Sequence, residues 1–241
     1  MSELFTKTLV SGISELGVAL PDGATEKFAR FYGLLTEKNA VMNLTAIRGD
    51  EETARLHFLD SLALLALPRL FDAPAGARLL DVGSGAGFPG MVLAAARPEL
   101  RVTLLDAREK RVDFLREAAA ALGLANVVCE AARAEELAKT RRAGFELVTA
   151  RAVARLDALC EMCLPLISDG GAFVAMKGAD CDGEIDGARR AIELLGGELE
   201  SVREYALPGM DIIRRAAVIR KTRECPPQYP RRWAAILKKP L

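Results

Sequence analysis

The sequence predicts an α/β protein with a doubly wound, largely parallel sheet, a helical cap before the sheet and an antiparallel hairpin at its end. Three observations support this class. From residue 77 onward, short apolar runs typical of buried strands alternate with helical patterns. A glycine-rich turn follows the first run. The last two predicted strands are joined only by residues 208–211, which are too few for a helical crossover.

Residues 1–74 are predicted to form the N-terminal helical cap. Apolar side chains recur at helical spacing in three segments, residues 3–17, 25–37 and about 50–66. Asp22-Gly23 predicts a turn before the second helix, and Thr25 is a candidate N-cap. Residues 39–47 follow without a clear period.

Residues 75–223 are predicted to form the main domain, and residues 224–241 a basic tail. The predicted strands cover residues 77–82, 101–106, 126–130, 145–150, 171–177, about 199–207 and about 213–221. The predicted helices lie near residues 88–96, 108–122, 133–139, 154–164 and 183–195. In such a sheet, ligands bind at the carboxyl ends of the strands.

The composition of the chain indicates where in the cell the protein acts. No run of about 18 apolar residues occurs, so no membrane span is expected. The start, MSELFTKTLV, lacks the layout of a secretory signal. Five cysteines, an odd number, fit a reducing cytoplasm better than a disulfide framework. We therefore expect a cytoplasmic protein, and a monomer.

Charge is distributed unevenly along the chain. The net charge is zero, but residues 214–241 hold nine Lys or Arg and a single acid, Glu224, which gives +8 there and −8 in the preceding residues. A basic end on a neutral protein indicates a polyanionic partner such as a nucleic acid.

The central motif is LLDVGSGAGFPG at residues 79–90. A buried strand breaks into glycines and then enters a helix. Glycines accept backbone angles closed to other residues and let a ligand approach the main chain. The helix that follows presents unpaired N–H groups. This stretch therefore predicts a nucleotide-binding loop.

The glycine loop is compatible with two different cofactors. Residues 85–90 match the G-x-G-x-x-G dinucleotide pattern, but Asp81 would then lie inside a buried strand, where an unpaired carboxylate is costly. In the other register, Gly83, Gly85 and Gly87 form the turn and Asp81 lies at the strand end beside the loop. This acidic-x-G-x-G-x-G pattern is typical of Rossmann-like class I enzymes that use S-adenosylmethionine (AdoMet), whose cationic groups suit a nearby carboxylate. We favour AdoMet; a nicotinamide-dependent oxidoreductase remains the alternative.

Other candidate ligand-binding residues follow later strands. Asp106 ends the second strand, where an acid can accept hydrogen bonds from both ribose hydroxyls, although it could also cap the next helix. Arg151 follows the fourth strand and could guide a nucleobase or the methionine carboxylate. Lys177 ends the fifth strand and faces the same cleft. Each of these two could instead be a solvated strand end.

No metal site is expected. His57 is the only histidine, and a lone histidine is more often a hydrogen-bonded structural residue than a catalyst. Cys160 and Cys163 lie in an apolar helical run, and no further ligands have a matching spacing.

Together these motifs resemble one family, the bacterial guanine-N7 methyltransferases of small-subunit (16S) ribosomal RNA, also called glucose-inhibited division protein B. The resemblance covers nearly the whole chain and rests on NLTAI at 43–47, HFLDSL at 57–62, DVGSGAGFPG at 81–90, LLDAREKRVDFL at 104–115, RAE at 133–135, ARAVARL at 150–156, AMKG at 175–178, YPRR at 229–232 and the closing Pro240-Leu241. This chain departs from the family at Lys38, at Leu56 and after the two arginines of YPRR, where Trp233-Ala234 replaces the usual Gly and Pro.

The resemblance implies methyl transfer from AdoMet to guanine N7, leaving S-adenosylhomocysteine (AdoHcy). The expected cofactor-binding residues are Asp81, Gly83, Gly85, Gly87, Phe88, Asp106, Ala107, Arg108, Ala134, Glu135 and Arg151, with Arg151 also the expected catalytic residue. The expected RNA-binding residues are Asn43, His57, Lys177, Arg231, Arg232, Lys238 and Lys239. The expected partner is 16S ribosomal RNA, alone, in the small subunit or in an assembly precursor. A non-catalytic RNA-binding module is a third hypothesis.

Overall fold

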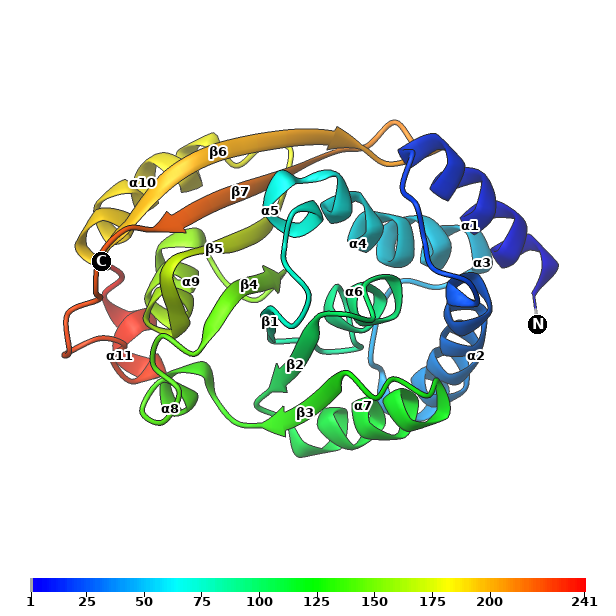
Figure 1. Ribbon diagram of the computed structural model, residues 1–241, viewed down its shortest axis with the longest axis horizontal. Helices are drawn as coiled ribbons and strands as arrows, with labels where there is room; N and C mark the ends of the chain where they lie inside the picture. The colour runs from blue at the N-terminus through cyan, green and yellow to red at the C-terminus, as the bar shows by residue number, and fades with distance from the viewer. Residues whose placement is uncertain (1) are drawn as a thin grey trace.

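The computed structural model describes residues 2–241, without the side chain of Phe71. Its centre is a seven-stranded sheet with the order β3-β2-β1-β4-β5-β7-β6 (Figure 1). The strands are β1 Arg78–Val82, β2 Arg101–Asp106, β3 Val127–Ala131, β4 Phe145–Arg151, β5 Ile167–Gly178, β6 Gly197–Ala206 and β7 Ile213–Lys221. Only the pairs that involve β7 are antiparallel, so the predicted terminal hairpin is confirmed.

The sheet is wound in both directions from β1, because β2 and β3 lie on one side of it and β4 and β5 on the other. The helices of the main domain are α6 Gly90–Ala96, α7 Glu109–Ala121, α8 Ala134–Leu137, α9 Leu156–Cys163, the 3-10 turn η3 Leu164–Leu166 and α10 Asp182–Leu194. This alternation confirms the predicted fold class, and it brings the carboxyl ends of β1, β2 and β4 together.

The N-terminal helices are α1 Glu3–Leu16, α2 Ala24–Met42, α3 Asp50–Thr53, the π-helical turn η1 Ala54–Leu59, α4 Asp60–Leu62, the 3-10 turn η2 Ala63–Ala66 and α5 Pro68–Phe71. The single helix predicted over residues 50–66 is therefore wrong in detail, since its middle is a π turn. The predicted Thr25 cap is also wrong: α2 begins one residue earlier, after Gly23 in a left-handed conformation.

Residues 39–47, which show no period in the sequence, divide between a helix end and a loop. α2 continues to Met42 and is closed by Asn43, whose φ of 48° is left-handed. The loop beyond is held by Asn39. Its Oδ1 accepts a hydrogen bond from the Thr45 N–H at 2.9 Å, and its Nδ2 donates to the Thr45 carbonyl at 3.0 Å.

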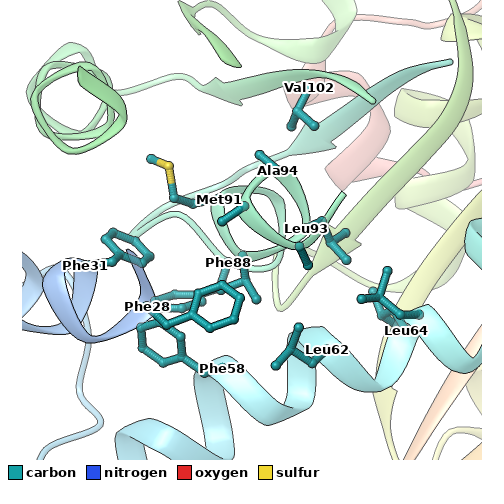
Figure 2. Close-up of a cluster of buried hydrophobic side chains, with 14 of the residues drawn as sticks. Phe28, Phe31, Phe58, Leu62, Leu64, Phe88, Met91, Leu93, Ala94 and Val102 are labelled. Carbon is teal, nitrogen blue, oxygen red and sulfur yellow. The ribbon is translucent and has the colours of Figure 1, made fainter. Parts of the chain in front are cut away.

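Hydrophobic clusters cover the two faces of the sheet. One contains the N-terminal helices together with α6 and α7, and the other contains α8, α9 and α10. Figure 2 shows how the first is joined: Phe28, Phe31 and Phe58 of the cap surround Phe88, two residues before α6. The cap and the sheet thus share one core.

The basic tail packs on the second cluster. It forms a short helix, α11 Trp233–Lys238, which Figure 1 shows beside α8 and α9. Ile236 of this helix is fully buried. The tail is therefore part of the folded body on the side of the sheet opposite to the cap.

Candidate active site

Two buried carboxylates hold the glycine loop between β1 and α6. Asp81 of β1 accepts a hydrogen bond on Oδ2 from the N–H of Gly90, at the start of α6, at 3.0 Å. Its Oδ1 accepts one from the Thr149 hydroxyl of β4 at 3.1 Å. Asp106 at the end of β2 accepts one on Oδ2 from the N–H of Gly85 at 3.0 Å. The two acids thus fix the loop at its middle and at its end.

Asp81 is 1% exposed and is one residue inside β1. Burial raises its pKa to about 6, although the hydrogen bonds from Gly90 and Thr149 and the charge of Arg151 oppose the shift. Asp81 lies near the carboxyl end of β1, as expected for the AdoMet register, because only Val82 follows it in the strand. A carboxylate at this position is not unpaired, however, since Gly90 and Thr149 both donate to it, so the cost of an unpaired carboxylate does not by itself decide between the two registers.

The glycines of the loop serve different purposes. A Cβ at Gly83, whose φ is +71°, would lie 2.5 Å from Val153 Cγ2 in the wall of a pocket. A Cβ at Gly87, whose φ is +102°, would instead lie 2.9 Å from the Phe31 ring of the cap. Gly83 therefore shapes a binding pocket, and Gly87 allows the cap to approach the loop.

A cavity of about 440 Å³ opens at the carboxyl ends of β1, β2 and β3. Its wall consists of Val82, Gly83, Leu105, Asp106, Ala107, Arg108, Arg111, Ala132, Arg133, Ala134, Glu135, Ala152, Val153, Met162 and Trp233. Its volume is that of a small-molecule site, which is commonly about 300–1,000 Å³. We call it the cofactor pocket.

The cofactor pocket fits a nucleoside. Asp106 is 5% exposed and lies at a strand tip, where a carboxylate can accept hydrogen bonds from a ribose. Its two oxygens also accept N–H groups from Gly85 and Arg108, at 3.0 and 2.9 Å, so the side chain is fixed before any ligand binds. Apolar side chains such as Val153 and Met162 supply surface for a purine.

A second cavity, of about 340 Å³, adjoins the first and shares Ala152 with it. It is lined by Ile47, Leu56, His57, Asp60, Arg151, Ala152, Met176, Lys177, Gly178, Tyr205 and Arg214. We call it the substrate cavity. The side chains that line it come from the cap, from the ends of β4 and β5, and from the terminal hairpin, so only the folded chain assembles it.

Arg151 lines the substrate cavity and binds several groups of the cap. Its Nη1 donates to the Leu56 carbonyl at 2.9 Å and to Asp60 Oδ2 at 3.2 Å, and its Nη2 donates to His57 Nδ1 at 2.8 Å. The guanidinium also lies 5.4 Å from the ring centre of Phe88. The cap therefore orients the strand-end arginine.

His57 is neutral in this arrangement. Arginine can only donate, so Nδ1 must accept and Nε2 carries the proton. This Nε2–H donates a hydrogen bond to the Thr45 hydroxyl oxygen 2.8 Å away. The imidazole stacks on Phe88 with ring centres 4.4 Å apart. Burial, and then the charge of Arg151, lower the pKa of His57 to about 3.

This low pKa has a measurable consequence for stability. The unfolded state takes up the proton below pH 6.5 and the folded state does so only near pH 3, so the contribution of His57 is complete above 6.5 and is lost as the pH falls through this range. Between pH 7 and pH 5, wild type should lose roughly 2 kcal/mol more unfolding free energy than His57→Asn, whose amide oxygen keeps an acceptor for Arg151. Urea unfolding at both pH values measures this, and equal losses would contradict it.

Several predicted cofactor residues do not reach the cofactor pocket. Asp81, Gly87 and Phe88 are buried around the loop, and Gly85 is likewise absent from the pocket wall. Phe88 packs into the cap rather than beside Ala134 and Glu135. Arg151 lines the substrate cavity instead. The pocket wall does contain the predicted Gly83, Asp106, Ala107, Arg108, Ala134 and Glu135.

The predicted RNA-binding residues are also dispersed. Lys177 is mostly buried, and its ammonium donates to the Ala154 carbonyl at 3.0 Å and to Glu184 at 2.8 Å. Arg231 is bound to the fully buried Glu161, with Nε 2.7 Å from Oε1. Both therefore have structural partners. The exposed members of the set are Asn43, Arg232, Lys238 and Lys239.

The substrate cavity contains residues that pattern analysis missed. Asp60 accepts a hydrogen bond from the Tyr205 hydroxyl at 2.9 Å and lies 3.9 Å from Arg214 Nε. That Nε is buried without a hydrogen-bond partner in the described chain. In the sequence, Asp60 is indicated only as part of the HFLDSL motif. No local sequence pattern indicates Tyr205 or Arg214 of the hairpin.

Among residues 2–241, no helix is long and apolar enough to cross a bilayer. In the same range, no three His, Cys, Asp or Glu side chains are grouped so as to hold a metal ion.

The sheet order, the glycine loop and the strand-end carboxylate define a class I AdoMet-dependent methyltransferase. The model of the family GidB, described as rRNA small subunit methyltransferase G, matches residues 24–212, and the chain belongs to this family. It is 43% identical to a Ribosomal RNA small subunit methyltransferase G of Pelotomaculum thermopropionicum, over 99% of both chains.

Solved structures support the fold. TrmN from Thermus thermophilus superposes with a TM-score of 0.50 and 26% identity, over 67% of this chain and 48% of that one. A 16S rRNA (adenine(1408)-N(1))-methyltransferase variant from Catenulisporales acidiphilia, solved with its cosubstrate SAM, gives 0.51 and 16%, over 62% and 87%. The family match supports AdoMet as the cofactor and does not favour the nicotinamide alternative, and the solved structures agree with the fold of that family.

Proposed function

We propose that this protein, acting as a cytoplasmic monomer, transfers the methyl group of AdoMet to N7 of a guanine in 16S ribosomal RNA. The observation that carries the proposal is the pair of adjoining cavities that share Ala152. One has the acid and the glycine that suit a nucleoside cofactor, and the other has the size and polar lining for a base. A methyl group can pass between ligands only where their pockets meet.

The bound cofactor supplies an electrophilic methyl group. Asp106 would hold the ribose, Ala134 and Glu135 the adenine side, and the main chain at Gly83 the methionine part. Since guanine N7 has a free lone pair at neutral pH, the chain need not remove a proton. His57 agrees with this, because its low pKa and its two hydrogen bonds leave it no role as a base.

Positive charge moves from the sulfonium to the guanine during the transfer. Asp60, 3% exposed and lining the substrate cavity, is the carboxylate placed to compensate that charge. Arg151 donates to Asp60 Oδ2 and to the Leu56 carbonyl at the same time, so it positions this carboxylate and borders the base. Arg214 lines the same cavity, and its Nε lies 3.9 Å from Asp60 Oδ1 but makes no hydrogen bond within the described residues, so its guanidinium is a candidate donor for a guanine acceptor.

The direct test maps the product. The protein with AdoMet is given naked 16S ribosomal RNA in one arm and small ribosomal subunits in the other. Borohydride and aniline then cleave the RNA at N7-methylguanosine. A single cleavage site in either arm supports the proposal. Methylation at a base other than guanine, or none in both arms while AdoHcy still binds, would overturn it and leave a cofactor-binding protein with another target.

Arg151→Ala should lower the single-turnover methyl-transfer rate about 100-fold, the usual scale for removing one positioned polar group from an active site. AdoHcy affinity should change less than threefold, because Arg151 lines the substrate cavity. Arg151→Lys is the matched variant: it keeps the charge but loses the fork that joins Leu56, His57 and Asp60, so it should remain at least tenfold slow. Wild-type rates in Arg151→Ala would refute the role.

The tail should contribute to RNA affinity through exposed cations. Lys238→Ala with Lys239→Ala should weaken RNA binding and reduce the log–log salt slope by about 1.4, or about 0.7 for each phosphate contact on a single strand. The control removes two exposed cations, Lys7 of α1 and Arg30 of α2. Figure 1 shows these two helices at the opposite end of the molecule from α11. Equal salt slopes for the two double variants would show that the tail has no special contact.

A further inference from the structure

Trp233 is the only tryptophan of the chain, and it lines the cofactor pocket. It belongs to the C-terminal segment, far in sequence from the glycine loop and from Asp106. We propose that Trp233 is a cofactor-binding residue, whose indole forms the wall against which the adenine of AdoMet packs. This inference rests on AdoMet as the cofactor and does not depend on which RNA base is methylated.

The chain fixes Trp233 in this place by several contacts. Its main-chain N–H donates to Glu135 Oε1 at 3.2 Å, and Glu135 is itself part of the pocket wall. Two residues earlier, Arg231 is bound through its N–H and its guanidinium to the buried Glu161 of α9. Three residues later, Ile236 is fully buried in the cluster that covers this face of the sheet.

The start of the C-terminal segment is held as well. The Arg142 guanidinium donates to three acceptors of the segment, the carbonyls of Cys225, Pro226 and Tyr229, at 2.5, 2.9 and 2.7 Å. Because the chain is anchored on both sides of Trp233, ligand binding does not have to pay for ordering this segment.

The surroundings of Trp233 suit a purine. The side chain is half-buried and packs on the hydrophobic cluster that contains α8 and α9. Around the same pocket lie Leu105, Val153 and Met162, which are apolar, and Glu135, which is an acceptor for an amino group. A purine has two apolar faces and a polar edge, and a stack on an aromatic side chain typically contributes a tenfold or greater gain in affinity.

The wild-type protein provides the first test, because all tryptophan fluorescence arises from Trp233. Titration with AdoHcy should change the intensity or the emission maximum along the same curve as calorimetric binding. Adenosine alone, at higher concentration, should produce the same spectral change, and L-homocysteine should not. Calorimetric binding of AdoHcy with an unchanged emission spectrum would overturn the proposal.

Variants provide the second test. Trp233→Ala should weaken AdoHcy binding about tenfold or more, and Trp233→Phe, which keeps an aromatic face, should weaken it less than threefold. Leu237→Ala is the matched control, since it shortens an exposed side chain on the same short helix and should leave the affinity unchanged. If Trp233→Ala does not fold, the Trp233→Phe affinity and the wild-type spectra decide. Equal affinities for Trp233→Ala and Leu237→Ala would overturn the proposal even if methyl transfer to RNA is intact.

Discussion

Gly83→Ala is expected to weaken AdoHcy binding by at least about 100-fold, equivalent to about 2.7 kcal/mol. The new Cβ would lie 2.5 Å from Val153 Cγ2, a distance that real contacts do not reach, so the pocket wall must move. The φ of +71° adds about 1–2 kcal/mol of backbone strain for a residue with a side chain. Calorimetry with AdoHcy measures the affinity, and thermal unfolding measures the strain.

Gly85→Ala separates the two causes. Gly85 has a similar φ of +57°, but a Cβ at this position would have the Gly83 carbonyl oxygen as its nearest neighbour at 3.8 Å, an ordinary contact. This variant should lose comparable stability, while its affinity for AdoHcy falls less than tenfold. Adding Val153→Ala to Gly83→Ala should restore at least tenfold of the lost affinity. Equal affinities for the two single glycine variants would contradict the steric explanation.

Arg231→Ala should reduce the unfolding free energy by about 3 kcal/mol or more, because it leaves a buried carboxylate without its partner. Glu161 is fully buried, and it accepts hydrogen bonds from both the main chain and the guanidinium of Arg231. Urea unfolding followed by circular dichroism gives the free energy directly.

Two variants check this explanation. Arg189→Ala breaks an exposed pair with Asp186 on α10, and it should cost less than about 0.5 kcal/mol. Glu161→Gln added to Arg231→Ala removes the uncompensated charge and should recover more than half of the loss. If Arg231→Ala proves as mild as Arg189→Ala, the ion pair is not structural. Truncating the tail would be a poor test of RNA binding, because it would also remove Arg231, the partner of the buried Glu161, and the buried side chain of Ile236.

The helices and strands of the main domain could be predicted because each has its own local pattern of apolar residues and turn residues. The strand ending at Asp106 was predicted with the bounds of β2, and the hairpin was indicated by the short connection at residues 208–211. The cap was less predictable. Its third helix contains the π turn around His57, and this turn depends on packing against Phe88 and Arg151 rather than on helical period.

The fold, the glycine loop and the acid at the tip of β2 can all be inferred from local sequence, because turn chemistry and hydrophobic period are properties of neighbouring residues. The side of the loop that each group faces becomes clear only in the folded chain. Asp81 and Phe88 are within a few residues of Gly83, yet they point into the core, whereas Trp233 reaches the cofactor pocket from the far end of the chain. The substrate cavity is likewise assembled from the cap, two strand ends and the hairpin. Side-chain direction at a turn and contacts between distant segments depend on the packing of the whole chain, so no local pattern records them.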